Sequence, residues 1–341
     1  MELHIQSCYN LDLLNLLNIL TADPFYTRRH PQVYAEFGEA LSQDSRDLLY
    51  PVTQALGNAM ISPILAFILS YLPDFEDVSL LELMAAEDSL LTRLQELAPR
   101  LAAQSALLTP LMRTLAPVLA EAENMGFREY WHSTCLPQIR HKQDELTHFA
   151  ESAHLETELD ALLGSSAPDE ISLYLCALAA PHAIKISGPR YIADISFNKE
   201  TIFAKALHDV FRPPFELESV RASLDAIAGD PFIRLAFERK DPAFGFPEMD
   251  GFLEENVVEA MSLYICQRAG LQDDPYGYLL KHNDGSHVFS VILLDYLQRF
   301  PKAPEQPFAQ AFNQLVAQMP IGSLTSAYQA ALENAGKPLA I

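Results

Sequence analysis

The chain has 341 residues, a length typical of two or three domains. Hydrophobic residues make up 49% and charged residues 20% of the chain, which supports a buried core and excludes global disorder. The formal net charge is −22, so the surface repels nucleic-acid phosphates and anionic membranes. We therefore expect neither nucleic acid nor a membrane as a partner.

The first residues and the cysteines predict a cytoplasmic protein. The start of the chain lacks a basic region followed by an apolar one, so no secretory signal is predicted. Residues 60–72 form the most apolar stretch, which is too short to span a bilayer. The cysteines form no CxxC pair, and we expect reduced, buried thiols at Cys8, Cys135, Cys176 and Cys266.

Hydrophobic periodicity predicts helices from residue 1 to about 165, followed by a change of pattern. Alternating and β-branched residues then predict short strands within residues 171–196, which would form a small mixed sheet. Further helices are predicted over 198–212, 252–268, 288–297, 313–319 and 323–335. The fold class expected from this order is mostly helical α+β.

The helix that ends at Pro213-Pro214 carries the most informative residues. His208 and Arg212 are four positions apart, so they share one helix face, and Asp209 follows His208 directly. In an HExxH zinc motif two histidines at this spacing bind one metal, and the Glu between them activates water. Here the Glu is shortened to Asp, and the second His is replaced by Arg.

A second helix, residues 252–268, places Glu255 and Glu259 on one face. Together with Leu207–Pro214 and the preceding strands near Ser187-Gly188, this segment resembles the gluzincin-like peptidases of the zincin superfamily, in particular bacterial families with an HExxHPP-like helix. The resemblance covers residues 125 to 300. It implies a zincin-like core over residues 121–341, preceded by a helical N-terminal region over residues 1–120.

The resemblance also implies roles for individual residues. His208 matches the first metal ligand and Glu255 the third, with Glu259 as the fallback for that third position. Asp209 occupies the position of the general base. Arg212 replaces the second histidine ligand.

Elementary chemistry opposes ordinary zinc catalysis at these positions. A guanidinium offers no lone pair to a metal, and its charge repels a dication. We expect Arg212 to form an ion pair with Glu255 or Glu259 and so to replace the metal as a tie between the two helices. Asp209 is one methylene shorter than Glu and reaches a metal-bound water poorly.

Other polar residues are candidates by position. His282 or His287 would supply a recruited metal ligand, and His287, Tyr276 or Tyr278 would stabilise an oxyanion. The alternative for the segment from His282 to His287 is a solvent-exposed turn. His141, Asp144, Glu145 and His148 share one helix face, for which a solvated surface is the simpler interpretation.

Three hypotheses about function remain open. In the first, the protein resembles a metallopeptidase but is catalytically inactive, holds no cofactor, and binds a peptide or protein in a cleft between the edge strand near Ser187-Gly188 and the His208 helix. In the second, it is an active zinc-dependent peptidase or hydrolase with a recruited ligand. In the third, it is a helical interaction protein without a functional cleft. The sequence leaves the oligomeric state open.

Overall fold

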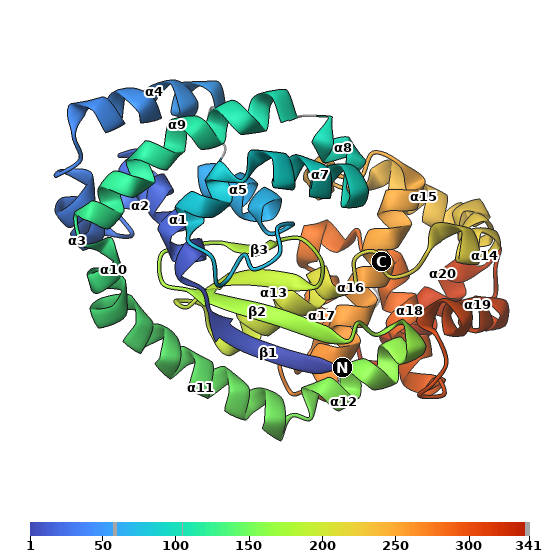
Figure 1. Ribbon diagram of the computed structural model, residues 1–341. Coiled ribbons are helices and arrows are strands. Elements are labelled where there is room, and N and C mark those ends of the chain that lie inside the picture. Colours follow the sequence, from blue (N-terminus) through green and yellow to red (C-terminus); the bar gives the residue numbers. More distant parts are fainter. Residues whose placement is uncertain (57–59, 104, 338–341) are drawn as a thin grey trace. The chain divides into compact units, whose positions relative to one another are not determined.

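The computed structural model describes residues 1–56, 60–103 and 105–337 (Figure 1). These residues are mostly helical with one small four-stranded sheet, so the predicted α+β class is confirmed. They form two compact units: unit 1 comprises Met1–Leu3, His148–Ile171 and Lys199–Ile341, and unit 2 comprises His4–Thr147 and Ser172–Asn198. The bounds of these units differ from those of the predicted regions 1–120 and 121–341. The division into an N-terminal helical region and a zincin-like core stays a prediction.

The sheet has the strand order β1-β2-β4-β3 and contains the three predicted strands. Strand β2 (Glu170–Cys176) pairs in parallel with β4 (Arg190–Asp194), and β3 (Ala183–Lys185) pairs with β4 in antiparallel orientation. The expected mixed sheet is therefore confirmed. Nearly every residue of β2 and β4 is buried, as is usual for parallel strands that are covered on both faces.

The prediction that residues 1 to about 165 are helical throughout is wrong at the start of the chain. Strand β1 spans Glu2–Ser7 and lies beside β2 at the end of the sheet. Polar and apolar residues alternate along it, which is the pattern of a strand with one covered face. The segment is too short for this alternation to stand out from the leucine-rich helix that follows it.

Helix α1 (Tyr9–Leu20) forms the centre of unit 2 and is buried at every position from Asn10 to Leu20. It packs against α5. Its Asp12 carboxylate is fully buried and accepts hydrogen bonds from the Trp131 indole and from the backbone N–H groups of Ala177 and Leu178. The only Trp is thus a core residue. The other helices of unit 2 are α2 (Pro24–Thr27), α3 (Pro31–Val33), α4 (Gln43–Leu56), α5 (Ile61–Leu69), α6 (Leu80–Ala85), α7 (Glu87–Leu97), α8 (Pro99–Ala102), α9 (Ser105–Asn124) and α10 (Phe127–Tyr130). Helix α11 (Leu136–Ser152) belongs to unit 2 up to Thr147.

Helix α16 (Met249–Arg268) is the central helix of unit 1 and packs against α12, α13, α14, α17 and α18 (Figure 1). Apolar side chains lie all round it, which is typical of a helix buried on every side. It ends where predicted, because Gly270 adopts a left-handed conformation (φ 70°) that reverses the chain. The other helices of unit 1 are α12 (Leu155–Leu163), α13 (Lys199–Val210), α14 (Leu217–Gly229), α15 (Pro231–Arg239), α17 (Pro275–Leu279), α18 (Val288–Arg299), α19 (Phe308–Gln318) and α20 (Leu324–Asn334).

Two further expectations concern the whole chain. All four cysteines are buried and free, as predicted. Among the described helices, none combines the length and the apolar character that crossing a bilayer requires.

Candidate functional site

Helix α13 presents the residues of the degenerate motif. Its last residue is Val210, and the following turn is tightened, because the Phe211 N–H bonds to the Leu207 carbonyl while the Arg212 N–H bonds to the Asp209 carbonyl. Arg212 therefore lies just beyond the regular helix but still one turn after His208. The predicted spacing of one helical turn between His208 and Arg212 is therefore kept.

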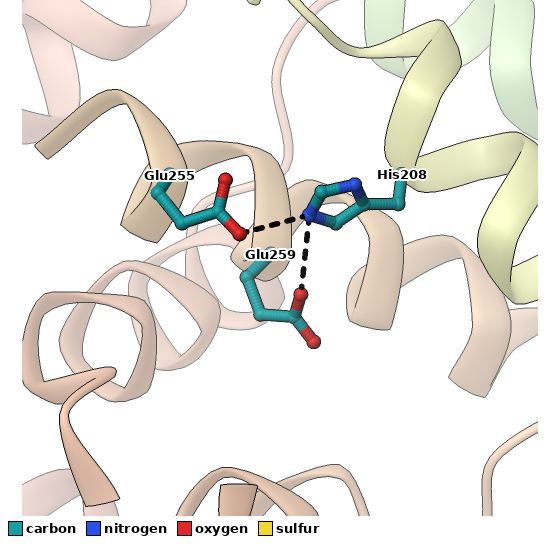
Figure 2. Close-up of side chains that lie close together, drawn as sticks. All are labelled: His208, Glu255 and Glu259. Carbon is teal, nitrogen blue, oxygen red and sulfur yellow. Dashed lines mark hydrogen bonds and ion pairs between the residues drawn. The ribbon is translucent and has the colours of Figure 1, made fainter. Parts of the chain in front are cut away.

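Helix α16 supplies two carboxylates to the same place (Figure 2). The His208 Nε2 atom lies 3.2 Å from Glu255 Oε1 and 3.6 Å from Glu259 Oε2. The side chains of Glu255 and Glu259 are 11% and 8% exposed, whereas that of His208 is 25% exposed. The imidazole thus lies between two nearly buried carboxylates that are one helical turn apart.

Arg212 contacts the same cluster through the second oxygen of Glu255. Its guanidinium forms an ion pair with Glu255 Oε2, so the predicted Arg212–Glu255 contact is confirmed. Asp209 is on the same helix, with Oδ1 3.7 Å from His208 Nδ1. The His208 imidazole and the Arg212 guanidinium therefore both contact Glu255, and His208 also lies near Glu259 and Asp209. We call His208, Arg212, Glu255 and Glu259 the charge cluster.

Burial shifts the pKa of the Glu259 carboxyl. It raises the pKa of this carboxyl above the ordinary value, an effect that the nearby charges of His208 and Arg212 and a hydrogen bond from Tyr278 oppose. Burial and the Glu259 charge raise the pKa of Tyr278 in turn, so the phenol stays a hydrogen-bond donor. Of the two tyrosines suggested by position, Tyr278 belongs to the site, whereas Tyr276 bonds to Gln298.

The expected alternative of a solvent-exposed turn is wrong for His287. The residue is 1% exposed, its ring stacks on His282 with centroids 5.2 Å apart, and its Nε2 accepts a 3.0 Å hydrogen bond from the Asn283 amide nitrogen. Burial and the charges of His282 and His208 lower the pKa of His287 to about 3. His282 in turn stacks on Tyr278, so the aromatic column ends beside the charge cluster.

Ser187 and Gly188, predicted to bind substrate, belong to unit 2. The Ser187 side chain is 5% exposed, and its hydroxyl is hydrogen-bonded to Ser70. Gly188 forms the turn between β3 and β4 with φ 68°. The predicted cleft between this turn and the His208 helix stays a prediction.

The donor atoms of the charge cluster can be compared with a metal centre. One ligand atom each from His208, Glu255 and Glu259 lies within 4.8 Å of the other two, and no other such group of His, Cys, Asp or Glu occurs in residues 1–56, 60–103 and 105–337. Around tetrahedral zinc, ligand atoms lie about 3.3 Å apart, close to the observed 3.2 and 3.6 Å. The spacing fits a divalent metal, but the adjoining guanidinium opposes its charge. The helix face with His141 and His148 is solvent-exposed, as expected.

None of the protein-family models, curated proteins and solved structures compared with the chain matches it. The resemblance to gluzincin-like peptidases therefore stays a prediction.

Proposed function

We propose that this chain is a metallopeptidase-like protein in which Arg212 takes the place of a metal ligand, and that it binds a peptide or protein without hydrolysing it. The observation that carries the proposal is the ion pair between Arg212 and Glu255, one turn after His208. A guanidinium cannot ligate a metal, and here it contacts one of the two carboxylates that a metal would need.

Electrostatics supports a metal-free cluster. A metal bound to Glu255 Oε1 would lie roughly 5 Å from a guanidinium on Oε2 of the same carboxylate, and at an effective dielectric constant of about 20 the repulsion between them is about 7 kcal/mol. The side chain of Arg212 is 35% exposed, so solvent screening reduces this penalty. The remaining repulsion still opposes the dication, whereas the ion pair already neutralises Glu255.

The sheet supports the peptide-binding part of the proposal. Strand β3 is the last strand in the order, and its three residues are only half-buried. Extended peptides add to such outer strands through backbone hydrogen bonds, which need no metal. A ligand of this kind would be recognised chiefly by its backbone.

The second candidate function is a metal-dependent hydrolase, and the donor spacing favours it. His208, Glu255 and Glu259 would hold the ion, which would supply a Lewis acid that activates water or polarises a carbonyl. The Tyr278 phenol, which bonds to Glu259 in the metal-free cluster, would have to turn its one proton toward a polarised oxygen. Arg212 would then have to leave Glu255.

The two candidates predict different results with tag-free protein. Quenched fluorescent peptides with blocked ends, assayed with and without added zinc, should not be cleaved, and binding of a blocked extended peptide should be lost when alternate backbone nitrogens are methylated. Zinc-dependent cleavage that disappears in His208→Ala would overturn the first proposal in favour of the second. Peptide binding that is indifferent to methylation would overturn the strand-addition mode.

A further inference from the structure

Unit 2 contains a cavity of about 520 Å³ that the charge cluster does not use. Three elements line it: the segment Ser70–Asp77 between α5 and α6, the side chains of Arg93 and Leu97 on α7, and the turn that leads from Ser187 and Gly188 to Arg190. The volume lies within the range of small-molecule sites, about 300 to 1,000 Å³. A ligand of a few residues at most would fill it.

Arg190 is held in a fixed position on the cavity wall. Its Nε donates to the Ser187 carbonyl at 2.9 Å, and its Nη2 donates to the Ser70 carbonyl and to the Ser187 hydroxyl. Ser70 and Ser187 are 0% and 5% exposed and bonded to each other, so this support is itself rigid. The remaining nitrogen, Nη1, makes no hydrogen bond within the described ranges. A guanidinium fixed in this way binds a carboxylate without first losing side-chain freedom.

Negative charge lies on another wall of the cavity, the segment Ser70–Asp77. Asp74 and Asp77 are exposed, and neither carboxylate forms an ion pair with a described residue. Glu76 differs, because its oxygens accept hydrogen bonds from Tyr174 and Gln6. Arg93 is 44% exposed and pairs with Glu96 at 3.2 Å, a surface contact that a ligand can replace at little cost.

This mixture of charges selects the class of ligand. A simple anion would face the acidic segment, and a simple cation would face two guanidinium groups. A molecule that carries both charges satisfies both walls. Apolar area is also present, because Leu97 on α7 is 56% exposed.

We propose that this cavity binds a small zwitterion of the amino-acid or dipeptide class. Its carboxylate would pair with Arg190 and Arg93, its ammonium with Asp74 or Asp77, and an apolar side chain would lie against Leu97. The proposal uses no residue of the charge cluster and does not rest on the proposed function. The two can fail separately, because the peptides used to test that function have blocked ends.

The test compares three forms of one dipeptide by titration calorimetry on the full chain. Alanyl-leucine should bind with a dissociation constant of about 1 mM or tighter. N-acetyl-alanyl-leucine, which lacks the ammonium, and alanyl-leucine amide, which lacks the carboxylate, should each bind at least about tenfold more weakly. No binding of alanyl-leucine, or equal binding of all three forms, would overturn the proposal.

Variants locate the site. Because Arg190 also makes structural hydrogen bonds, Arg93→Gln and Asp77→Asn are the main variants, and each should weaken alanyl-leucine by about threefold with an unchanged melting temperature. The matched control is Arg100→Gln, an exposed arginine of α8 that does not line the cavity. Arg190→Lys, which keeps the charge but not the fork, should weaken binding by about tenfold. Affinity that is unchanged in both main variants, or that falls equally in the control, would refute this location.

Discussion

The exchange of Arg212 for histidine tests the physical reasoning about the charge cluster. In the double variant Arg212→His with Asp209→Glu, the guanidinium is lost and an imidazole appears one turn after His208. The Asp209→Glu exchange lengthens the carboxylate side chain between them by one methylene. We expect this variant to bind zinc, because His208, the new imidazole and Glu255 provide the three protein ligands of a catalytic zinc site.

The expected gain in affinity follows from the geometry. The repulsion of about 7 kcal/mol between Arg212 and a dication at roughly 5 Å, worked at an effective dielectric constant of about 20, is an upper value. Because the side chain of Arg212 is 35% exposed, we expect less than half of it to be realised, about 3 kcal/mol. That free energy alone corresponds to at least a hundredfold tighter zinc binding, to which the new ligand adds.

Competition with a chromophoric chelator measures this gain. Arg212→Leu separates the two contributions, because it removes the charge without adding a ligand. Arg221→His is the matched control, since Arg221 also forms an ion pair with a carboxylate of α16, Asp250, and its side chain is similarly exposed at 34%. A folded double variant that binds zinc no more tightly than the Arg221→His control would refute the account of the cluster.

Three further predictions concern stability. Asn256→Ala should lower the free energy of unfolding by about 3 kcal/mol, because the buried amide accepts from the first N–H groups of α18 and donates to α16. Asp12→Ala should cost about 3 kcal/mol as well, since it leaves the Trp131 indole and two backbone N–H groups without their buried acceptor. His287 has a pKa of about 3 in the folded protein against 6.5 ordinarily, so the unfolded chain takes up its proton first as the pH falls. The stabilisation that comes from the neutral His287 imidazole is therefore complete above pH 6.5. The free energy of unfolding falls by up to roughly 5 kcal/mol as the pH is lowered toward 3.

Urea denaturation monitored by circular dichroism measures all three effects. For Asn256, the surface variant Asn334→Ala in the same unit is the control, and equal losses in the two would contradict the capping role. For Asp12, a loss no larger than that in Trp131→Phe would show that the backbone donors do not depend on the carboxylate. For His287, the variant His287→Phe should flatten the stability profile between pH 6.5 and 3, and an unchanged slope would contradict the assignment.

Local patterns in the sequence predicted much of the fold. Alternation and β-branched residues identified β2, β3 and β4, and helical periodicity identified α16 and its end. Strand β1 was missed, because its residues are stabilised by pairing with β2, which lies more than 160 positions later in the chain. Such pairing depends on long-range contacts that a short alternating segment does not reveal.

The charge cluster was predictable to the extent that it depends on helix geometry. A spacing of four residues places Arg212 one helical turn after His208, and Glu259 one turn after Glu255 on the same helix face. Charge complementarity then favours the ion pair between Arg212 and Glu255 that the structure contains. The neighbours of the cluster were not predictable. Whether Tyr276 or Tyr278 reaches Glu259, and whether His287 is buried, depends on how α17 and the following turn pack on α16. No periodicity in the sequence encodes that packing.

We propose that an arginine replaces a metal ligand in this protein. The most direct test is the metal content of tag-free protein, purified without chelator, incubated with zinc, dialysed, and measured by plasma mass spectrometry. We predict that no stoichiometric zinc is retained. One zinc ion per chain, lost in His208→Ala and in Glu259→Gln, would contradict it and would identify the charge cluster as a metal centre.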